Sequence, residues 1–276
     1  LDFDARTSWA LPQVECAEQW SSVIDRSVDF SHPCWRAVEA MTDLALERAG
    51  DRCVVGVTDL HGNFDTLAAM RGAEGLCEDM LDAPDLVQQA SLTAARAFTG
   101  AFERLWARIE SQGFGCTTWA PLHHLGPCYL PSCDFWCLVG PDMAEQIVPA
   151  LQAEMRPLER SLFHLDGPDA HRHLDRVLAL PGLDAVQWVY GAGNGPATRW
   201  TETYRRILEA GKSVQVLASQ EAGLALLDQL GTQGVWLTID EPFEDRESAE
   251  AYVKEVECRQ RRSQNLTRCK QQAESR

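Results

Sequence analysis

The sequence predicts an α/β protein in which short buried strands alternate with amphipathic helices. Apolar runs of strand length recur along the chain, most of them end in polar residues beside a Gly or Pro turn, and helical spacing of apolar residues follows. Strands that are separated by helices pair in parallel. Eight such units would close a (β/α)8 barrel, whereas six or seven could form an open doubly wound sheet.

The expected strands are four to seven residues long, most of them are largely apolar, and polar residues follow most of them. Because ligands of both barrels and open sheets bind at the carboxyl ends of parallel strands, these polar residues are the first candidates for a site. The strands are expected at residues 1–5, 53–57, 114–119, 133–139, 162–165, 185–190, 214–217 and 234–239.

Several of the expected helices begin at capping or proline residues, and several end at glycines. Pro84 marks an early helical position, and Gly50 and Gly113 mark ends. Pro149 lies inside a helical pattern and should kink or break it. The helices are expected at residues 31–50, 65–70, 82–113, 142–156, 169–180, 198–210, 221–230 and from 245 onward.

The chain of 276 residues, 45% of them hydrophobic, suits a single barrel domain over residues 1–276. We expect an N-terminal cover and helix (1–50), a barrel core (51–240) and a C-terminal helix and tail (241–276). The net charge of −16 argues against nucleic-acid and membrane partners, and no apolar run reaches membrane-spanning length. We therefore expect a cytoplasmic protein that takes a small-molecule substrate, and we expect native residues before Leu1. The oligomeric state stays open.

Two acid–imidazole pairs are the strongest candidates for catalytic groups. His164 and Asp166 lie two apart at the end of an apolar run that breaks at a Gly-Pro turn, so both side chains project from one face of a strand. They could bind substrate, act in acid–base catalysis or hold a metal ion. Asp59 and His61 repeat this spacing and could act together as general base and orienting partner. The alternative for each pair is simple turn chemistry.

Further residues at strand ends are candidates for substrate binding. A carboxylate would bind a polar group, an indole would stack on a flat or methylated ligand, and ordinary packing is the alternative. Neighbouring residues of one strand point to opposite faces, so Gln187 and Trp188 should not both line a pocket. The candidates are Asp134, Trp136, Trp119, Gln187, Trp188 and Asn194.

Neither the ten cysteines nor the remaining histidines are expected to form a metal cluster. The chain has no Cys-x-x-Cys, and the cysteines inside apolar runs behave as small hydrophobes, so reduced thiols are expected. We expect surface positions for His123, His124, His171 and His173.

Five segments in a characteristic order resemble the uroporphyrinogen decarboxylase-like superfamily, and within it the corrinoid (cobalamin)-dependent methyltransferases. They are Leu-Ala-Ala-Met-Arg-Gly-Ala-Glu (67–74), Ser-Cys-Asp (132–134), Phe-His-Leu-Asp-Gly (163–167), Leu-Pro-Gly-Leu-Asp-Ala-Val-Gln-Trp (180–188) and Gly-Ala-Gly-Asn-Gly-Pro (191–196). This resemblance implies a closed (β/α)8 barrel. It also implies transfer of a methyl group between a corrinoid protein, which would be a partner, and a small molecule. The arginine-rich motif of true uroporphyrinogen decarboxylases is missing, so decarboxylation of a porphyrinogen is not expected.

The resemblance also implies a zinc site, which this sequence alters. Members of the branch bind zinc through His-x-Cys and a further Cys near the last strand. This chain keeps His164 but has Asp166 in the place of that Cys, and residues 236–240 contain no Cys. His and Asp are harder ligands than His and two Cys, so they suit zinc–thiolate chemistry less well. The alternatives are therefore a lyase or hydrolase that uses the His and Asp groups in acid–base catalysis, and a non-catalytic ligand-binding homologue.

Overall fold

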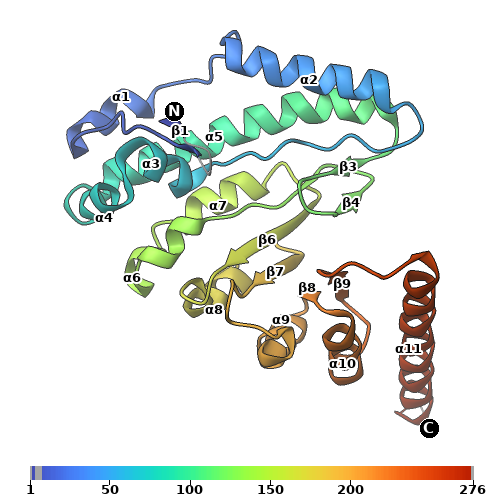
Figure 1. The fold of residues 1–276 in the computed structure, drawn as a ribbon. Coiled ribbons are helices and arrows are strands. Elements are labelled where there is room, and N and C mark those ends of the chain that lie inside the picture. Colours follow the sequence, from blue (N-terminus) through green and yellow to red (C-terminus); the bar gives the residue numbers. More distant parts are fainter. Residues whose placement is uncertain (1, 4–7, 275–276) are drawn as a thin grey trace. The chain divides into compact units, whose positions relative to one another are not determined.

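The computed structural model describes residues 2–3 and 8–274, with side chains described for residues 10–263. From Cys128 onward, helices alternate with strands of a parallel sheet (Figure 1), and this confirms the α/β class. A parallel sheet has the strand order β5-β6-β7-β8-β9. Its strands are β5 (Cys128–Tyr129), β6 (Arg160–Asp166), β7 (Ala185–Val189), β8 (Ser213–Ala218) and β9 (Val235–Ile239).

The chain forms two compact units. The first unit comprises Leu1–Phe163 and Arg172–Leu183, and the second comprises His164–His171 and Asp184–Arg276. No helix among the described residues is both long and apolar enough to cross a membrane.

The first unit is mainly helical and is organised around the long helix α5 (Pro84–Ile109). Pro84 occupies the first turn of this helix, as predicted, and Val87, Phe98 and Leu105 are buried on one side of it. Several helices of the unit contact α5 (Figure 1). These are α1 (Ser21–Ile24), α2 (Pro33–Ala49), α3 (Asn63–Arg71), α4 (Ala73–Asp82) and α7 (Val148–Met155).

The helix predicted over residues 142–156 is broken, as the internal proline indicates. It forms α6 (Pro141–Ala144) and α7, with Pro149 in the first turn of α7, where its missing N–H leaves no helical bond unmade. The helix α4 was not predicted. It follows α3 directly because Gly72, at φ +83°, takes a backbone conformation that other residues rarely adopt.

Three of the predicted strands of the first unit differ from expectation. Residues 53–57 are not a strand: Val57 N–H donates to Thr117 O at 2.9 Å, but the backbone of Val55 is paired with the side-chain amide of Gln112 instead of with a neighbouring strand. Only residues 116–117 of the expected run 114–119 form a strand. This strand, β3 (Cys116–Thr117), pairs antiparallel with β4 (His123–His124) rather than in parallel.

The third difference concerns residues 133–139, which form the 3₁₀-helix η3 (Asp134–Leu138). The two carboxylate oxygens of Asp65 accept the backbone N–H groups of Asp134 and Phe135, at 3.1 and 2.9 Å. This contact satisfies the donors that a helical turn leaves unpaired at its start, and so favours the turn over a strand.

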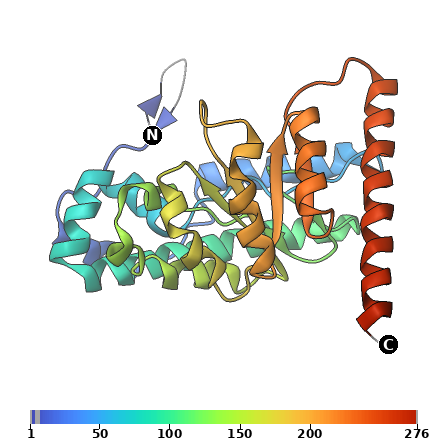
Figure 2. The ribbon, with the colours of Figure 1, turned by 90° about the horizontal axis from the view of Figure 1, so that it is seen from below.

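The second unit contains parallel strands covered by helices. β7 pairs with β8 and β8 with β9, in register Gln187↔Gln215 and Gln215↔Trp236. The helices α9 (Thr201–Glu209) and α10 (Gln220–Leu230) contact β8, and α10 also contacts α11 (Arg246–Glu274). Figure 2 shows α10 between the strands and α11 in a second view. All five predicted helix and strand regions after residue 197 are confirmed within a few residues.

The remaining short elements are as follows. They are β1 (Asp2–Phe3), paired antiparallel with β2 (Ser8–Trp9), η1 (Ala17–Trp20), η2 (Glu110–Gln112), η4 (Ala170–His173), α8 (Leu174–Leu178) and η5 (Ala197–Trp200). The strand predicted over residues 1–5 is thus present at residues 2–3, and the rest of it lies outside the described residues.

Candidate functional site

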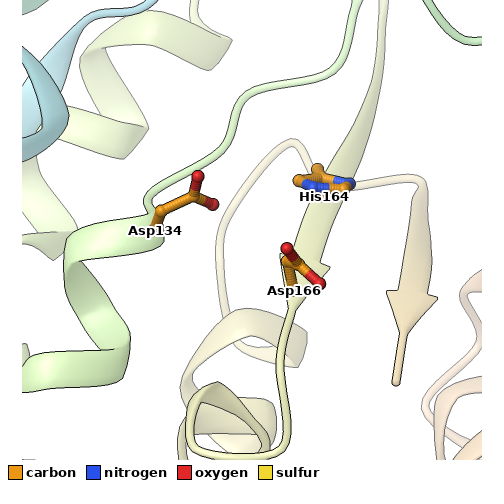
Figure 3. Close-up of side chains that lie close together, drawn as sticks. All are labelled: Asp134, His164 and Asp166. Carbon is orange, nitrogen blue, oxygen red and sulfur yellow. The ribbon is translucent and has the colours of Figure 1, made fainter. Parts of the chain in front are cut away.

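His164 and Asp166 project from the same face at the carboxyl end of β6, as their spacing predicts (Figure 3). A potential ligand atom of His164 and one of Asp166 lie within 4.8 Å of each other. Both side chains are partly buried. Asp134, the third side chain labelled in Figure 3, belongs to the first unit and is described with that unit below.

A chain of side-chain hydrogen bonds runs from His164 across the strands of the second unit. Nδ1 of His164 bonds to Oε1 of Gln187. The amide nitrogen of Gln187 donates to Oε1 of Gln215 at 2.7 Å, and the amide nitrogen of Gln215 donates to Oγ1 of Thr238 at 3.0 Å. The four residues come from β6, β7, β8 and β9.

This series of hydrogen bonds determines which nitrogen of His164 carries the proton. Oε1 of Gln187 is an acceptor only, so Nδ1 must donate a proton to it. In the neutral imidazole the lone pair is then on Nε2, the nitrogen that can accept a proton or bind a metal ion. Gln187 and Gln215 are 4% and 1% exposed. An unpaired amide at such a buried position would destabilise the protein, so the direction of the hydrogen bonds along the chain of side chains is kept.

Gln187 and Trp188 point to opposite faces of β7, as predicted. Gln187 belongs to the hydrogen-bond chain, whereas Trp188 is fully buried and packs edge-on against Trp200, with ring centroids 5.0 Å apart. His171 also packs edge-on against Trp188 and bonds to Thr203 through Nε2 at 2.8 Å. Trp188 is therefore a core residue of the second unit.

In the first unit, His61 lies between two carboxylates. Its Nε2 is 3.2 Å from Oδ2 of Asp59, and its Nδ1 is 3.9 Å from Oδ2 of Asp65. Asp65 and Asp59 together raise the pKa of His61 to about 9, so the imidazole is protonated at neutral pH. A protonated imidazole can donate a proton and can neutralise a nearby carboxylate, but it cannot accept a proton. Within the predicted pair, His61 could therefore act as a general base only at a pH above that pKa.

The loop that carries Asp59 is held by a buried tyrosine. The hydroxyl of Tyr129 accepts the N–H of Leu60 at 2.6 Å and lies 3.3 Å from Oδ1 of Asp59. Tyr129 is fully buried on β5, and burial raises its pKa. A strand residue thus positions a loop carboxylate that is itself half-exposed.

Glu154 is a nearly fully buried carboxyl group close to the start of α3. Its Oε2 accepts the side-chain N–H of Asn63 at 2.9 Å, and Asn63 also donates to Ser132 O at 2.8 Å. Burial, together with the charge of Asp65, raises the pKa of Glu154 to about 8. Glu154 is therefore protonated at neutral pH. A Cβ at Gly62 would lie 1.9 Å from its Oε1, so the Glu154 carboxyl group would have to shift if any other residue replaced this glycine.

Of the remaining predicted residues, Asp134 lies beside the His61 group, because its backbone N–H donates to Asp65 and it lines the same cavity as His61 and Asp65. Trp136 is fully buried, donates to Ala144 O and stacks on the ring of His173. Asp134 and Trp136 do not share a strand face, because η3 replaces the strand. Trp119 is 45% exposed, and the side chain of Asn194 bonds to Ala192 O in its own loop.

The surface position predicted for His173 is wrong. His173 is fully buried, its Nε2 lies 3.1 Å from both Trp136 O and Val139 O, and burial lowers its pKa. His123 is exposed, as predicted, whereas His124 and His171 are partly buried.

Sequence reasoning missed four residues that organise these sites: Asp65, Tyr129, Glu154 and Gln215. Two of them had a signal in the sequence. Asp65 lies four residues after His61 at a helix start, and Val-Gln occurs at residues 186–187 and again at 214–215, in two strands with the same face alternation. Tyr129 and Glu154 act over 69 and 91 residues of sequence separation, which no local pattern reveals.

No protein-family model, curated protein or solved structure matches this chain.

Proposed function

We propose that this chain is a methyltransferase whose reaction centre is the carboxyl end of β6. The observation that carries the proposal is the bond from Nδ1 of His164 to Gln187, because it leaves Nε2 as the basic nitrogen beside the carboxylate of Asp166. The resemblance of the five segments to corrinoid-dependent methyltransferases supports methyl transfer as the reaction class.

The proposed chemistry is a proton transfer coupled to methyl transfer. Nε2 of His164 takes the proton from the thiol of a small acceptor, and Asp166 stabilises the imidazolium that results. The sulfur lone pair then forms the new bond to the methyl carbon. The electron pair of the broken bond stays with the methyl donor, a methylated corrinoid that a partner protein presents as substrate.

The zinc ion implied by the resemblance does not fit the donors of the second unit. A catalytic zinc site uses three protein ligands, and thiolate chemistry favours cysteine among them. Among the described residues of the second unit, His164 and Asp166 offer a nitrogen and an oxygen donor, and Cys258 lies on α11 rather than at a strand end. The proposed reaction therefore assigns activation of the thiol to His164 as a base and includes no step through zinc.

The test is protein-dependent loss of the methyl group from methylcobalamin in the presence of a small thiol, followed by absorbance and by mass of the methylated thiol. We expect His164→Ala and Asp166→Asn to reduce the rate by about a hundredfold or more, the usual contribution of a general base. His123→Ala, an exposed histidine of the first unit, is the matched control and should leave the rate unchanged. Absence of any protein-dependent methyl loss would contradict the proposal.

A lyase or hydrolase that uses His164 and Asp166 is the second candidate, and the Asp at the position of the expected Cys favours it. Activity of the metal-free protein toward esters or hydroxy acids, without methyl loss from methylcobalamin, would support it. Stoichiometric zinc in the purified protein would instead contradict the assignment of His164 as a base. A chain whose cellular phenotype survives His164→Ala and Asp166→Ala would be a non-catalytic binding protein.

We also propose that the parallel strands belong to a closed (β/α)8 barrel and that the protein acts in the cytoplasm. The resemblance supports the barrel, and the free thiols of the described cysteines suit a reducing compartment. A crystal structure with a closed ring of strands would test the first, and the redox state of the thiols in cells would test the second.

A further inference from the structure

Two cysteines of the first unit lie against each other in its hydrophobic core. Cys116 is on β3 and Cys128 is on β5, both side chains are fully buried, and both carry free thiols. Sγ of Cys116 is 3.3 Å from the carbonyl oxygen of Cys128, and Sγ of Cys128 is 3.6 Å from the carbonyl oxygen of Cys116. Each sulfur is therefore close to the backbone of the other residue, an arrangement that favours a disulfide bond between them.

The two thiols differ in how readily they lose a proton. A hydrogen bond between them lowers the pKa of Cys116 and raises the pKa of Cys128. Because the thiolate is the form that attacks an oxidant, Cys116 is the sulfur that reacts first. Cys128 is then the neighbouring thiol that converts an oxidised Cys116 into a disulfide bond, so the pair contains both of the groups that such a reaction needs.

An oxidant reaches these buried sulfurs when the hairpin of β3 and β4 opens. This hairpin is short, because its paired residues are Cys116 with His124 and Thr117 with His123. Leu125, which follows β4 directly, is 75% exposed and so adds little packing to the hairpin. Two-stranded hairpins of this length are marginally stable, and such elements open locally while the rest of a domain stays folded. Opening of the hairpin exposes Cys116 to solvent.

Each of the two cysteines is followed directly by a residue that holds the loop over residues 57–60. The carbonyl oxygen of Thr117 accepts the N–H of Val57 at 2.9 Å. The hydroxyl of Tyr129 accepts the N–H of Leu60 at 2.6 Å. A covalent bond between the neighbouring cysteines would fix these two anchors relative to each other, so it would restrict the motion of the loop that carries Asp59.

We propose that Cys116 and Cys128 are a redox-sensitive pair, which hydrogen peroxide converts into a reversible disulfide bond that restricts the loop over residues 57–60. The peroxide first converts the thiol of Cys116 into a sulfenic acid, and one water leaves. The sulfur of Cys128 then attacks that sulfur, the S–S bond forms and a second water leaves. The two thiols lose two electrons and two protons in total, and the peroxide is reduced to water. The pair lies wholly within the first unit, and the proposal does not depend on methyl transfer.

The test is peptide mapping of the full chain after treatment with hydrogen peroxide, with the remaining thiols alkylated before cleavage by chymotrypsin. Cleavage after Trp119 separates the two cysteines, so a disulfide bond appears as a pair of linked peptides in the mass spectrum. We expect the peptide of Cys116 linked to the peptide of Cys128, in a yield that rises with the peroxide dose and is lost on addition of dithiothreitol. Oxidation of the exposed thiols without this linked pair would overturn the proposal.

Hydrogen exchange of the reduced and the oxidised protein, followed by NMR, measures the effect on the loop. We expect the amides of Val57 and Leu60 to exchange about tenfold or more slowly in the oxidised form, because the cross-link opposes opening of β3 from β5. The amides of α10, in the second unit, should exchange equally in both forms. Equal exchange of Val57 and Leu60 in the two forms would overturn the assigned effect on the loop.

Cys116→Ala should abolish both the linked peptides and the slower exchange, and circular dichroism would check that this variant folds. Cys53→Ala removes an exposed cysteine of the same unit and is the matched control, which should respond to peroxide as the wild type does. Slower exchange of Val57 in peroxide-treated Cys116→Ala would show that another oxidation causes it. Each of these outcomes is independent of the methyl-transfer assay.

Discussion

Two ionisable residues near the start of α3 show how strongly burial and charge decide protonation. His61 is half-exposed, and two nearby carboxylates raise its pKa to about 9. Glu154 is 1% exposed, and burial keeps it protonated up to a pH of about 8. Both groups therefore carry a proton at neutral pH, one for electrostatic reasons and the other because its charged form is poorly solvated.

Glu154 should make the first unit less stable as pH rises. Its pKa is about 8 in the folded chain against an ordinary value of 4.5, so the unfolded chain loses this proton first. Between these two pH values the free energy of unfolding should fall by about 1.4 kcal/mol per pH unit from this residue alone. Glu154→Gln keeps the shape of the protonated group and should flatten the dependence between pH 5 and pH 8.

Urea unfolding of the wild type and the variant at several pH values would measure this effect. Glu47→Gln, at an exposed position of α2, is the control and should follow the wild type. An equally steep dependence in Glu154→Gln and the wild type would show that the buried carboxyl is not its source.

At the scale of elements, the sequence predicted the second unit well and the first unit poorly. Strands β6 to β9 are apolar, flanked by turns and paired in parallel, so local pattern and final structure agree. The sequences of residues 53–57 and 133–139 also predict strands, but contacts with side chains distant in the sequence favour other backbone structures. Gln112 replaces a strand partner for Val55, and Asp65 caps a helical turn at residue 134.

The same contrast applies to the candidate site. The pairing of His164 with Asp166 follows from the alternation of a strand and was predictable. The hydrogen bond between His164 and Gln187 joins residues that are 23 apart in the sequence and lie on different strands. Gln187 could be identified as the partner of His164 only once the register of these strands was known.

The hydrogen-bond chain across the strands should control the tautomer of His164. Gln187→Leu removes the acceptor of Nδ1 and leaves Oε1 of Gln215 without its donor. We expect a shift of the neutral imidazole toward the Nε2–H tautomer, seen in its ¹⁵N chemical shifts. We also expect a loss of about 1–3 kcal/mol in stability from the unpaired buried amide.

Gln229→Leu, at an exposed position of α10, controls for the change of side-chain type. If the ¹⁵N chemical shifts of the His164 imidazole are the same in Gln187→Leu as in this control, the hydrogen-bond chain does not determine the tautomer.

At the scale of the molecule, neither unit is a continuous piece of the chain. The second unit takes His164–His171 from one segment and the rest from Asp184 onward. The early segment contributes the N–H of Gly167, which donates to Val189 O at 2.9 Å, and His164 itself. The second unit should therefore depend on residues that a simple cut at residue 184 would remove.

A fragment of residues 184–276 should fold less completely than a fragment of residues 160–276, because β7 then loses the contacts made by residues 164–167. Hydrogen exchange of the β7 amides would measure the difference, with faster exchange expected in the shorter fragment. Equal protection of β7 in both fragments would show that the early segment is dispensable.

The hydrogen bonds that run from His164 through Gln187 and Gln215 to Thr238 all donate in the same direction. This common direction limits how the four side chains can rearrange when the protonation of His164 changes. If a proton or an ion were to occupy Nε2, the present arrangement would be retained. If the imidazole instead had to accept at Nδ1, Gln187 and Gln215 would both have to rotate by half a turn, and the hydroxyl of Thr238 would have to become a donor. The strands thus offer two self-consistent proton patterns and no intermediate one, so the tautomer of His164 and the role of the Thr238 hydroxyl, three strands away, must change together.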